Sequence, residues 1–232
     1  MPKPICVVVL GLPRSGTTLI STAIGSHEDV CMLDEDFFMS VRRISGGKTP
    51  AVKLCIPNHI QMNRKWRTWW GIIRINGFLR KRLHYLLPRS YYSLNDYIST
   101  YDVRIICILR EPLKTLSAMD NRGHTKLRKA LRAANVAYDM YDELLDRIPE
   151  QVAFISFDRF LTSPEEQNRM ICSFIDHDFD EKMLEAPAKN TRYPGQSFDK
   201  SKIGTEDYDT ESLDPGILKI VERYKKLISL SF

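Results

Sequence analysis

The stretch "VVVLGLPRSGTT" (residues 7–18) joins a run of aliphatic, mostly β-branched residues to a short loop bounded by glycines and closed by two threonines. Continuous apolar runs of this kind are typical of buried parallel strands. Glycines at this spacing let the backbone approach an anion, and the helix that follows directs its first amides at the same point. The stretch therefore predicts a strand, a phosphate-binding loop and a helix that extends to about residue 26.

The loop departs from the common nucleotide-hydrolysing form at one position. In that form a lysine follows the second glycine and reaches the terminal phosphates, and the next Ser or Thr binds magnesium. Here Thr17 takes the place of the lysine and Thr18 follows it. This substitution disfavours an ATPase, a GTPase or an ordinary kinase, and it leaves a glycine-rich turn that binds nothing as the plainest alternative.

Three more apolar runs predict parallel strands: "AVKLCI" (51–56), "RIICIL" (104–109) and "VAFISF" (152–157). Helical patterns separate or follow them, at residues 15–26, 113–121, 125–147, from "TSPEEQ" (162–167) onward, and 214–228. Strands that alternate with helices predict an α/β protein, a P-loop-type three-layer fold with a central parallel sheet. Ligands of such sheets lie beyond the carboxyl ends of the strands.

The 232 residues fit one domain, 1–232. Residues 58–100, between the predicted strands 51–56 and 104–109, are rich in Trp, Tyr and Arg and predict a helical insertion. Residues 190–214 mix Gly, Ser, Asp and Lys with little periodicity, and we expect a loop that folds over the site.

Positive charge is concentrated in one part of the chain. No Asp or Glu occurs from Phe37 to Asn95, where twelve Lys and Arg residues lie, although the whole chain has a net charge of only +5. Such a field attracts an anionic substrate or partner. The basic aromatic insertion could stack on sugars, bind an anionic glycan, contact an anionic membrane surface, or be a solvated basic cap. We expect no nucleic-acid partner.

Location and redox state are also indicated by the sequence. No signal peptide and no membrane-spanning apolar segment is visible, which predicts a soluble, cytoplasmic protein. The five cysteines form no CxxC pair and lie mostly in apolar runs. They predict buried, reduced thiols and no metal site.

The segment "GLPRSGTTLISTAIGSHEDV" (11–30) resembles the 5′-phosphosulfate-binding loop of sulfotransferases, in the "PRSGTT" branch that includes tyrosylprotein, bacterial and carbohydrate enzymes. The resemblance implies 3′-phosphoadenosine 5′-phosphosulfate (PAPS) as sulfuryl donor and 3′-phosphoadenosine 5′-phosphate (PAP) as product, with no metal. It also implies that the guanidinium of Arg14 replaces the missing lysine. The donor-binding residues implied here are Pro13, Arg14, Ser15, Gly16, Thr17 and Thr18.

A second segment, "RIICILREPLKTLSAMDNR" (104–122), resembles the family's 3′-phosphate-binding element. The resemblance implies that Arg110 binds the 3′-phosphate and that Arg122 is a further nucleotide contact. The family's serine usually follows the arginine by eight residues, where this chain has Ala118. Ser117 comes one residue early, a rotation of about 100° on a helix, so it can serve only if the turn at Pro112 is also shorter.

The tyrosylprotein branch carries its catalytic base 21 residues after the loop arginine, which corresponds here to Glu35. Asp34 and Asp36 flank it. They would raise its pKa by like-charge repulsion, or one of them is itself the active carboxylate. A solvated acidic turn is the alternative interpretation of this segment.

Lys53 matches a lysine that cytosolic members of the family place near the transferred sulfuryl group. Those enzymes have a base histidine two residues later, where this chain has Cys55, and this difference favours Glu35 as the base. His59 is a weaker substitute.

Two further matches involve the nucleotide. Phe157 stands where the family often has a nucleotide-contacting tyrosine, and "FDKSKIG" (198–204) resembles the loop that closes over the adenosine. The latter implies contacts from Ser201 and Lys202.

The sequence therefore predicts a sulfotransferase that acts on a hydroxyl of a carbohydrate or small-metabolite acceptor. Arg14, Lys53 and Glu35 are its expected catalytic residues. Two alternatives stay open: a divergent P-loop nucleotide kinase or hydrolase, and a non-catalytic module of the same fold that binds an anion.

Overall fold

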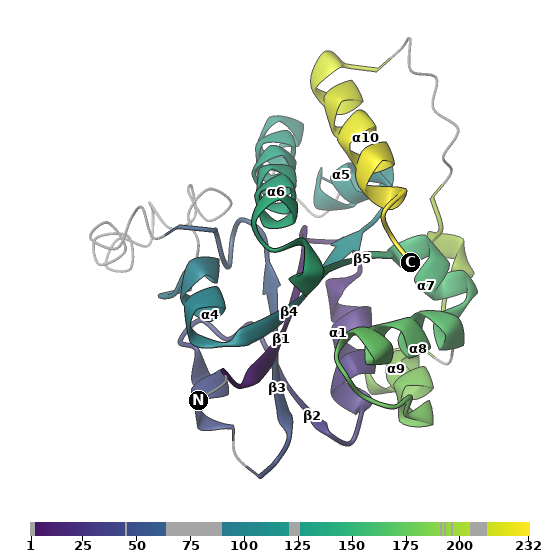
Figure 1. The fold of residues 1–232 in the computed structure, drawn as a ribbon. Coiled ribbons are helices and arrows are strands. Elements are labelled where there is room, and N and C mark those ends of the chain that lie inside the picture. Colours follow the sequence, from purple (N-terminus) through teal and green to yellow (C-terminus); the bar gives the residue numbers. More distant parts are fainter. Residues whose placement is uncertain are drawn as a thin grey trace.

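A five-stranded parallel sheet forms the centre of the computed structural model (Figure 1). The structure describes residues 3–44, 46–63, 90–120, 126–190, 192, 194–195, 197–204 and 213–232. The strand order is β2-β3-β1-β4-β5. The strands are β1 (Ile5–Gly11), β2 (Val30–Asp34), β3 (Thr49–Cys55), β4 (Asp102–Leu109) and β5 (Val152–Ser156).

The central strand β1 shows why a parallel sheet suits this sequence. Its residues Cys6 to Leu10 are all fully buried, and successive side chains enter opposite cores. Cys6, Val8 and Leu10 belong to one apolar cluster, and Val7 and Val9 to the other. A strand with apolar neighbours on both faces needs the continuous run that the sequence has, because no residue of it faces water.

Helices cover both faces of the sheet (Figure 1). The core that contains Val8 is closed by the following helices: α4 (Leu94–Thr100), α5 (Pro112–Asp120), α6 (Leu127–Arg147) and α10 (Pro215–Ile228). The core that contains Val9 is closed by α1 (Thr17–Ser26), α7 (Phe157–Thr162), α8 (Pro164–Phe174) and α9 (Ala186–Lys189). These two helical layers and the sheet make the predicted three-layer α/β fold.

Four short 3₁₀ helices complete the described secondary structure: η1 (Ser40–Arg43), η2 (Pro149–Gln151), η3 (Glu181–Glu185) and η4 (Lys200–Lys202). The last of these lies in the segment predicted to fold over the site. Asp214 caps α10 as its side chain accepts a hydrogen bond from the Gly216 amide at 2.8 Å, as the "DPG" sequence predicts.

The structure adds one strand to those predicted and shifts the bounds of others: β3 runs from Thr49 to Cys55 and β4 begins at Asp102. The added strand, β2, was not predicted; its apolar run is only four residues long, from Val30 to Leu33, and it lies at the sheet edge with mostly half-buried side chains. β5 ends at Ser156 rather than at residue 157. Phe157 instead begins α7, whose cap is the Ser156 side chain accepting from the Arg159 amide at 3.2 Å.

Most of the predicted insertion, residues 64–89, lies outside the described residues, and the suggested membrane and glycan contacts fall there. Within the part of the chain that the structure describes, no helix has the length and apolar character needed to cross a membrane.

Candidate active site

A cavity of about 530 Å³ opens at the carboxyl ends of the central strands. Its lining comes from the loop after β1, the ends of β2 and β3, the residue after β4, the start of α7 and the segment after α9. The predicted residues that line it are Pro13, Arg14, Gly16, Thr17, Thr18, Glu35, Lys53, Arg110, Phe157 and Lys202. Residues far apart in the chain thus meet at one cavity, near the point between β1 and β4 where the connections that leave these two strands lead to opposite sides of the sheet.

The loop after β1 is held in shape by its own hydrogen bonds. The amide and the hydroxyl of Ser15 both donate to the Leu12 carbonyl, at 3.1 and 2.8 Å. Gly16 then adopts a φ of 94° and precedes α1 directly. The first amides of a helix have no acceptor inside it, so this geometry directs the start of α1 at the cavity.

Gly16 also allows a close approach between two segments. A Cβ built at this position would lie 2.1 Å from the Phe157 ring. The loop after β1 and the start of α7 can therefore pack together only because residue 16 has no side chain.

Arg110, directly after β4, connects three parts of the cavity. Its guanidinium donates to the Arg14 carbonyl at 2.8 Å and to the Lys202 carbonyl at 3.0 Å, and it lies 4.8 Å from the centre of the Phe157 ring. Burial lowers the pKa of this guanidinium, against the opposing charge of Asp158. Its Nε is buried and has no hydrogen-bond partner among the described residues, which leaves a donor for an anion.

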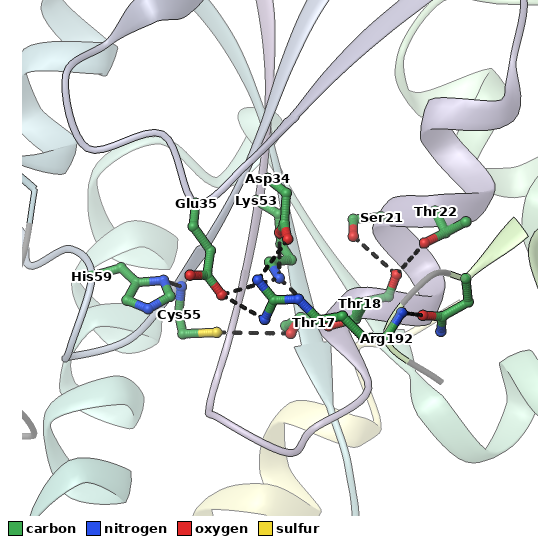
Figure 2. A network of polar contacts seen from close by, with 11 residues as sticks. Thr17, Thr18, Ser21, Thr22, Asp34, Glu35, Lys53, Cys55, His59 and Arg192 are labelled. Atoms are coloured by element: carbon green, nitrogen blue, oxygen red, sulfur yellow. Dashed lines mark hydrogen bonds and ion pairs between the residues drawn. The ribbon is translucent and has the colours of Figure 1, made fainter. Parts of the chain in front are cut away.

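Four charged side chains, three of them in the cavity lining, form a closed set that we call the charge ring: Asp34, Glu35, Lys53 and Arg192 (Figure 2). The ammonium of Lys53 pairs with Asp34 and lies 3.7 Å from Glu35 Oε1. Arg192 joins the same two carboxylates, with its Nη1 2.8 Å from Glu35 Oε1 and its Nη2 2.9 Å from Asp34 Oδ2. Each cation thus contacts both carboxylates.

Lys53 is the most deeply placed member of the ring, with its side chain 1% exposed. Its ammonium also donates to Thr18 Oγ1 at 3.4 Å. A buried ammonium is costly unless it is paired, and Asp34 supplies that pairing. The charge of Lys53 is therefore held beside the start of α1.

The prediction that neighbouring aspartates raise the pKa of Glu35 is wrong. Burial acts to raise this pKa, but the hydrogen bond from Arg192 and the charges of His59, Lys53 and Arg192 together bring it below its ordinary value. Asp34 faces Lys53 and Arg192, so its charge is compensated. Asp36 accepts from the amides of Phe38 and Val41, at 3.0 and 3.2 Å, and fixes a turn instead of facing the cavity.

His59 and Cys55 lie together in the cavity wall (Figure 2). The Cys55 amide donates to His59 Nδ1 at 3.1 Å. This bond occupies Nδ1, so that nitrogen is not an open base. Burial raises the pKa of the Cys55 thiol. Of the candidates for the base, Glu35 has the better-suited environment.

Three of the predicted donor-binding residues that the structure describes are not part of the cavity lining. The Ser15 hydroxyl is used within the loop, and Ser117 is exposed on α5 outside the cavity lining. Ser201 donates to Asp199 Oδ1 at 2.5 Å, also outside the lining. Arg122 lies outside the described residues.

The residue that sequence reasoning missed is Arg192. Its position is set by the segment after α9, where the Asn190 side chain accepts from the Arg192 amide at 3.1 Å. The only signal in the sequence is that this arginine lies in the loop predicted to fold over the site. No spacing rule singles it out.

The sheet order, the loop after β1 and the cations around it define a P-loop-type α/β protein. A scan against models of known protein families found no match, and a search among curated proteins found none either. Solved structures do match. The chain has the sulfotransferase fold.

Three of the similar structures cover nearly the whole of both chains. The sulfotransferase domain from the curacin biosynthetic pathway has a TM-score of 0.61 and 14% identity, with 100% of each chain covered. The sulfotransferase domain of the Synechococcus PCC 7002 olefin synthase has a TM-score of 0.55 and 11% identity, with 97% of this chain and 96% of that one covered. A sulfotransferase from Alicyclobacillus acidocaldarius has a TM-score of 0.52 and 14% identity, with 100% and 97% covered.

Proposed function

We propose that the protein is a sulfotransferase that moves a sulfuryl group from PAPS to a hydroxyl of a carbohydrate or small-metabolite acceptor. One observation carries the proposal: a loop of phosphate-binding pattern without its lysine shares one cavity with Arg110 and with the paired Lys53 and Glu35. The cavity thus contains cations that could bind two anionic groups and a carboxylate that could accept a proton. The resemblance to bacterial and carbohydrate sulfotransferases supports the acceptor class.

The cavity fits a nucleotide donor with two separate anionic groups. The loop from Pro13 to Thr18 and the start of α1 would hold the 5′-phosphosulfate. Arg110, which has an unpartnered buried Nε among the described residues, would hold the 3′-phosphate. Phe157 and Lys202 also line this cavity. We retain Ser117, Arg122 and Ser201 as proposed contacts of the same nucleotide.

When bound, this donor supplies a sulfuryl group joined to a phosphate that can leave. Lys53, Thr18 and Arg14, which line the cavity, would hold such a group. The fixed charge of Lys53 costs no rearrangement during the reaction, since Asp34 and the Thr18 hydroxyl already hold it. Preorganised positive charge of this kind stabilises the negative charge that develops on the transferred group and on the leaving oxygen.

Glu35 is the proposed base that takes the proton of the acceptor hydroxyl. Its backbone is fixed by an amide that donates to the Lys53 carbonyl at 3.1 Å, and its φ is 56°. The lowered pKa keeps the carboxylate ionised through the neutral range, so the base is in its active form there. Its side chain is 23% exposed and is therefore within reach of an acceptor that enters the cavity.

The test is transfer of sulfur-35 from labelled PAPS to a panel of sugars and phenolic metabolites. We expect labelled sulfate ester with at least one hydroxyl acceptor, and loss of the product in Lys53→Met and Glu35→Gln. Absence of transfer to every acceptor, together with magnesium-dependent hydrolysis of ATP, would replace this proposal with the nucleotide hydrolase.

A further inference from the structure

Arg192 reaches the charge ring from a distant part of the chain. The guanidinium lies 2.8 Å from Glu35 and 2.9 Å from Asp34, and 157 positions separate it from Glu35. A planar guanidinium has parallel donors, so it can bridge two neighbouring carboxylates at once, which a lysine ammonium does less well. Figure 2 shows its guanidinium beside the Glu35 carboxylate.

The segment that carries Arg192 is fixed on both sides. Before it, Asn190 is buried and its side-chain oxygen accepts from the Arg192 amide. Further along, Arg110 donates to the Lys202 carbonyl at 3.0 Å. The same segment therefore contributes Arg192 at the Glu35 end of the cavity and Lys202 at the Arg110 end.

The charge ring needs a second cation. Lys53 alone faces two carboxylates, and the closer of them is Asp34. Without Arg192, Glu35 Oε1 would have only the ammonium at 3.7 Å as a cationic partner within the ring. Two adjacent carboxylates that share one cation repel each other, and the side chain of Glu35 would be free to turn away.

We propose that Arg192 is a positioning residue of the sulfuryl-transfer site, whose guanidinium holds the Glu35 and Asp34 carboxylates in place opposite Lys53. This role rests on the proposed function, since it presumes that Glu35 is the base. In the reaction, Arg192 keeps Glu35 ionised and aimed while leaving the proton transfer itself to the carboxylate.

The groups that act on Glu35 can be named. Asp34 on β2 and Lys53 on β3 lie in the ring, His59 and Cys55 lie in the wall behind it, and Arg192 comes from the segment after α9. The Arg192 hydrogen bond is the largest of the influences that lower the pKa of Glu35. Removal of the guanidinium therefore raises this pKa, whereas a role confined to folding would leave it unchanged.

The experiment follows the carboxyl signal of Glu35 by NMR in protein labelled with ¹³C at the glutamate side chain. The signal is assigned by its absence in Glu35→Gln, and acid titrations compare wild type with Arg192→Gln and Arg192→Lys. Arg147→Gln is the matched control, since its side chain is 44% exposed against 46% for Arg192 and pairs with a single glutamate, Glu143.

We expect the midpoint pH of the Glu35 titration to rise in Arg192→Gln. It should rise by a smaller amount in Arg192→Lys and stay unchanged in the control. An unmoved midpoint in Arg192→Gln overturns the positioning role. This measurement needs neither donor nor acceptor, so its failure is distinct from failure of the proposed function, which would appear as absence of sulfate transfer by the wild type.

Once an acceptor has been found, turnover measurements distinguish the positioning role of Arg192 from two alternative roles. The positioning role predicts that the acid limb of the kcat profile moves to higher pH in Arg192→Gln. A faster kcat at neutral pH would instead mark Arg192 as an inhibitory latch. A rise in the acceptor KM with an unmoved profile would mark it as an acceptor-binding residue. Either result overturns the proposal.

Discussion

The ring of Phe157 occupies the space that a side chain at Gly16 would need, with 2.1 Å between the ring and the position of a Cβ. This contact joins the loop after β1 to the first residue of α7. Arg110 lies over the same ring at 4.8 Å and donates to the Arg14 carbonyl. The two proposed anion-binding elements are thus held together by one glycine, one aromatic ring and one guanidinium.

The first prediction concerns this contact. Gly16→Ala forces the loop and α7 apart, and with a φ of 94° it also strains the backbone. We expect a loss of about 3 kcal/mol in the free energy of unfolding, measured by denaturant titration, and weaker binding of PAP.

Gly47→Ala is the matched control, because Gly47 has a φ of 80° but no atom within 4 Å of a built Cβ. We expect it to cost about 1 kcal/mol from backbone strain alone. Equal losses in the two variants would show that the Phe157 contact is not the reason for glycine at position 16.

The second prediction concerns the 3′-phosphate. Arg110→Gln removes the guanidinium with the unpartnered buried Nε, and a charge-assisted contact of this kind contributes about 2 kcal/mol. We expect the Kd for PAP to rise about 30-fold by calorimetry. Binding of adenosine 5′-phosphate, which lacks the 3′-phosphate, should change far less. A similar loss for both nucleotides would place the 3′-phosphate elsewhere.

The third prediction concerns the base. Glu35→Gln keeps the size of the side chain but cannot accept a proton, so we expect kcat to fall by about 100-fold or more. PAP should bind with nearly unchanged affinity, because the proposed role of Glu35 is to take a proton from the acceptor and not to hold the nucleotide. Turnover that survives this change would move the role of base to Asp34 or His59.

The fourth prediction concerns stability and pH. The folded-state pKa of Glu35 is lowered, so its ionised form adds stability above the unfolded-state pKa of about 4.3. That contribution is lost as pH falls through the lower, folded-state pKa. The difference in unfolding free energy between wild type and Glu35→Gln should therefore shrink as the pH falls from the unfolded-state pKa through the folded-state pKa of Glu35. A difference that is independent of pH would contradict the lowered pKa.

The features that depend on local sequence pattern could be predicted from the sequence alone. The continuous apolar run of β1 gave a correct central strand, and the glycine spacing after it gave a loop that lines the cavity. The strand end at Leu109 likewise placed Arg110 in that cavity. Parallel strands bring their carboxyl ends to one edge, so local patterns were enough to gather these residues.

The features that depend on tertiary contacts could not be predicted from the sequence. The edge strand β2 has an apolar run of only four residues, and Arg192 meets Glu35 only through the fold. The direction of the Glu35 pKa shift was mistaken for the same reason. Adjacent carboxylates in a sequence suggest repulsion, but in the structure Asp34 faces two cations and Asp36 caps a turn.

The central claim is that this phosphate loop binds a 3′-phosphorylated adenosine nucleotide without requiring magnesium. Calorimetry with PAP in the presence of a chelator, compared with ATP and magnesium, tests it most directly. The account predicts clear binding of PAP and little or none of ATP. Tight magnesium-dependent binding of ATP with no binding of PAP would contradict it.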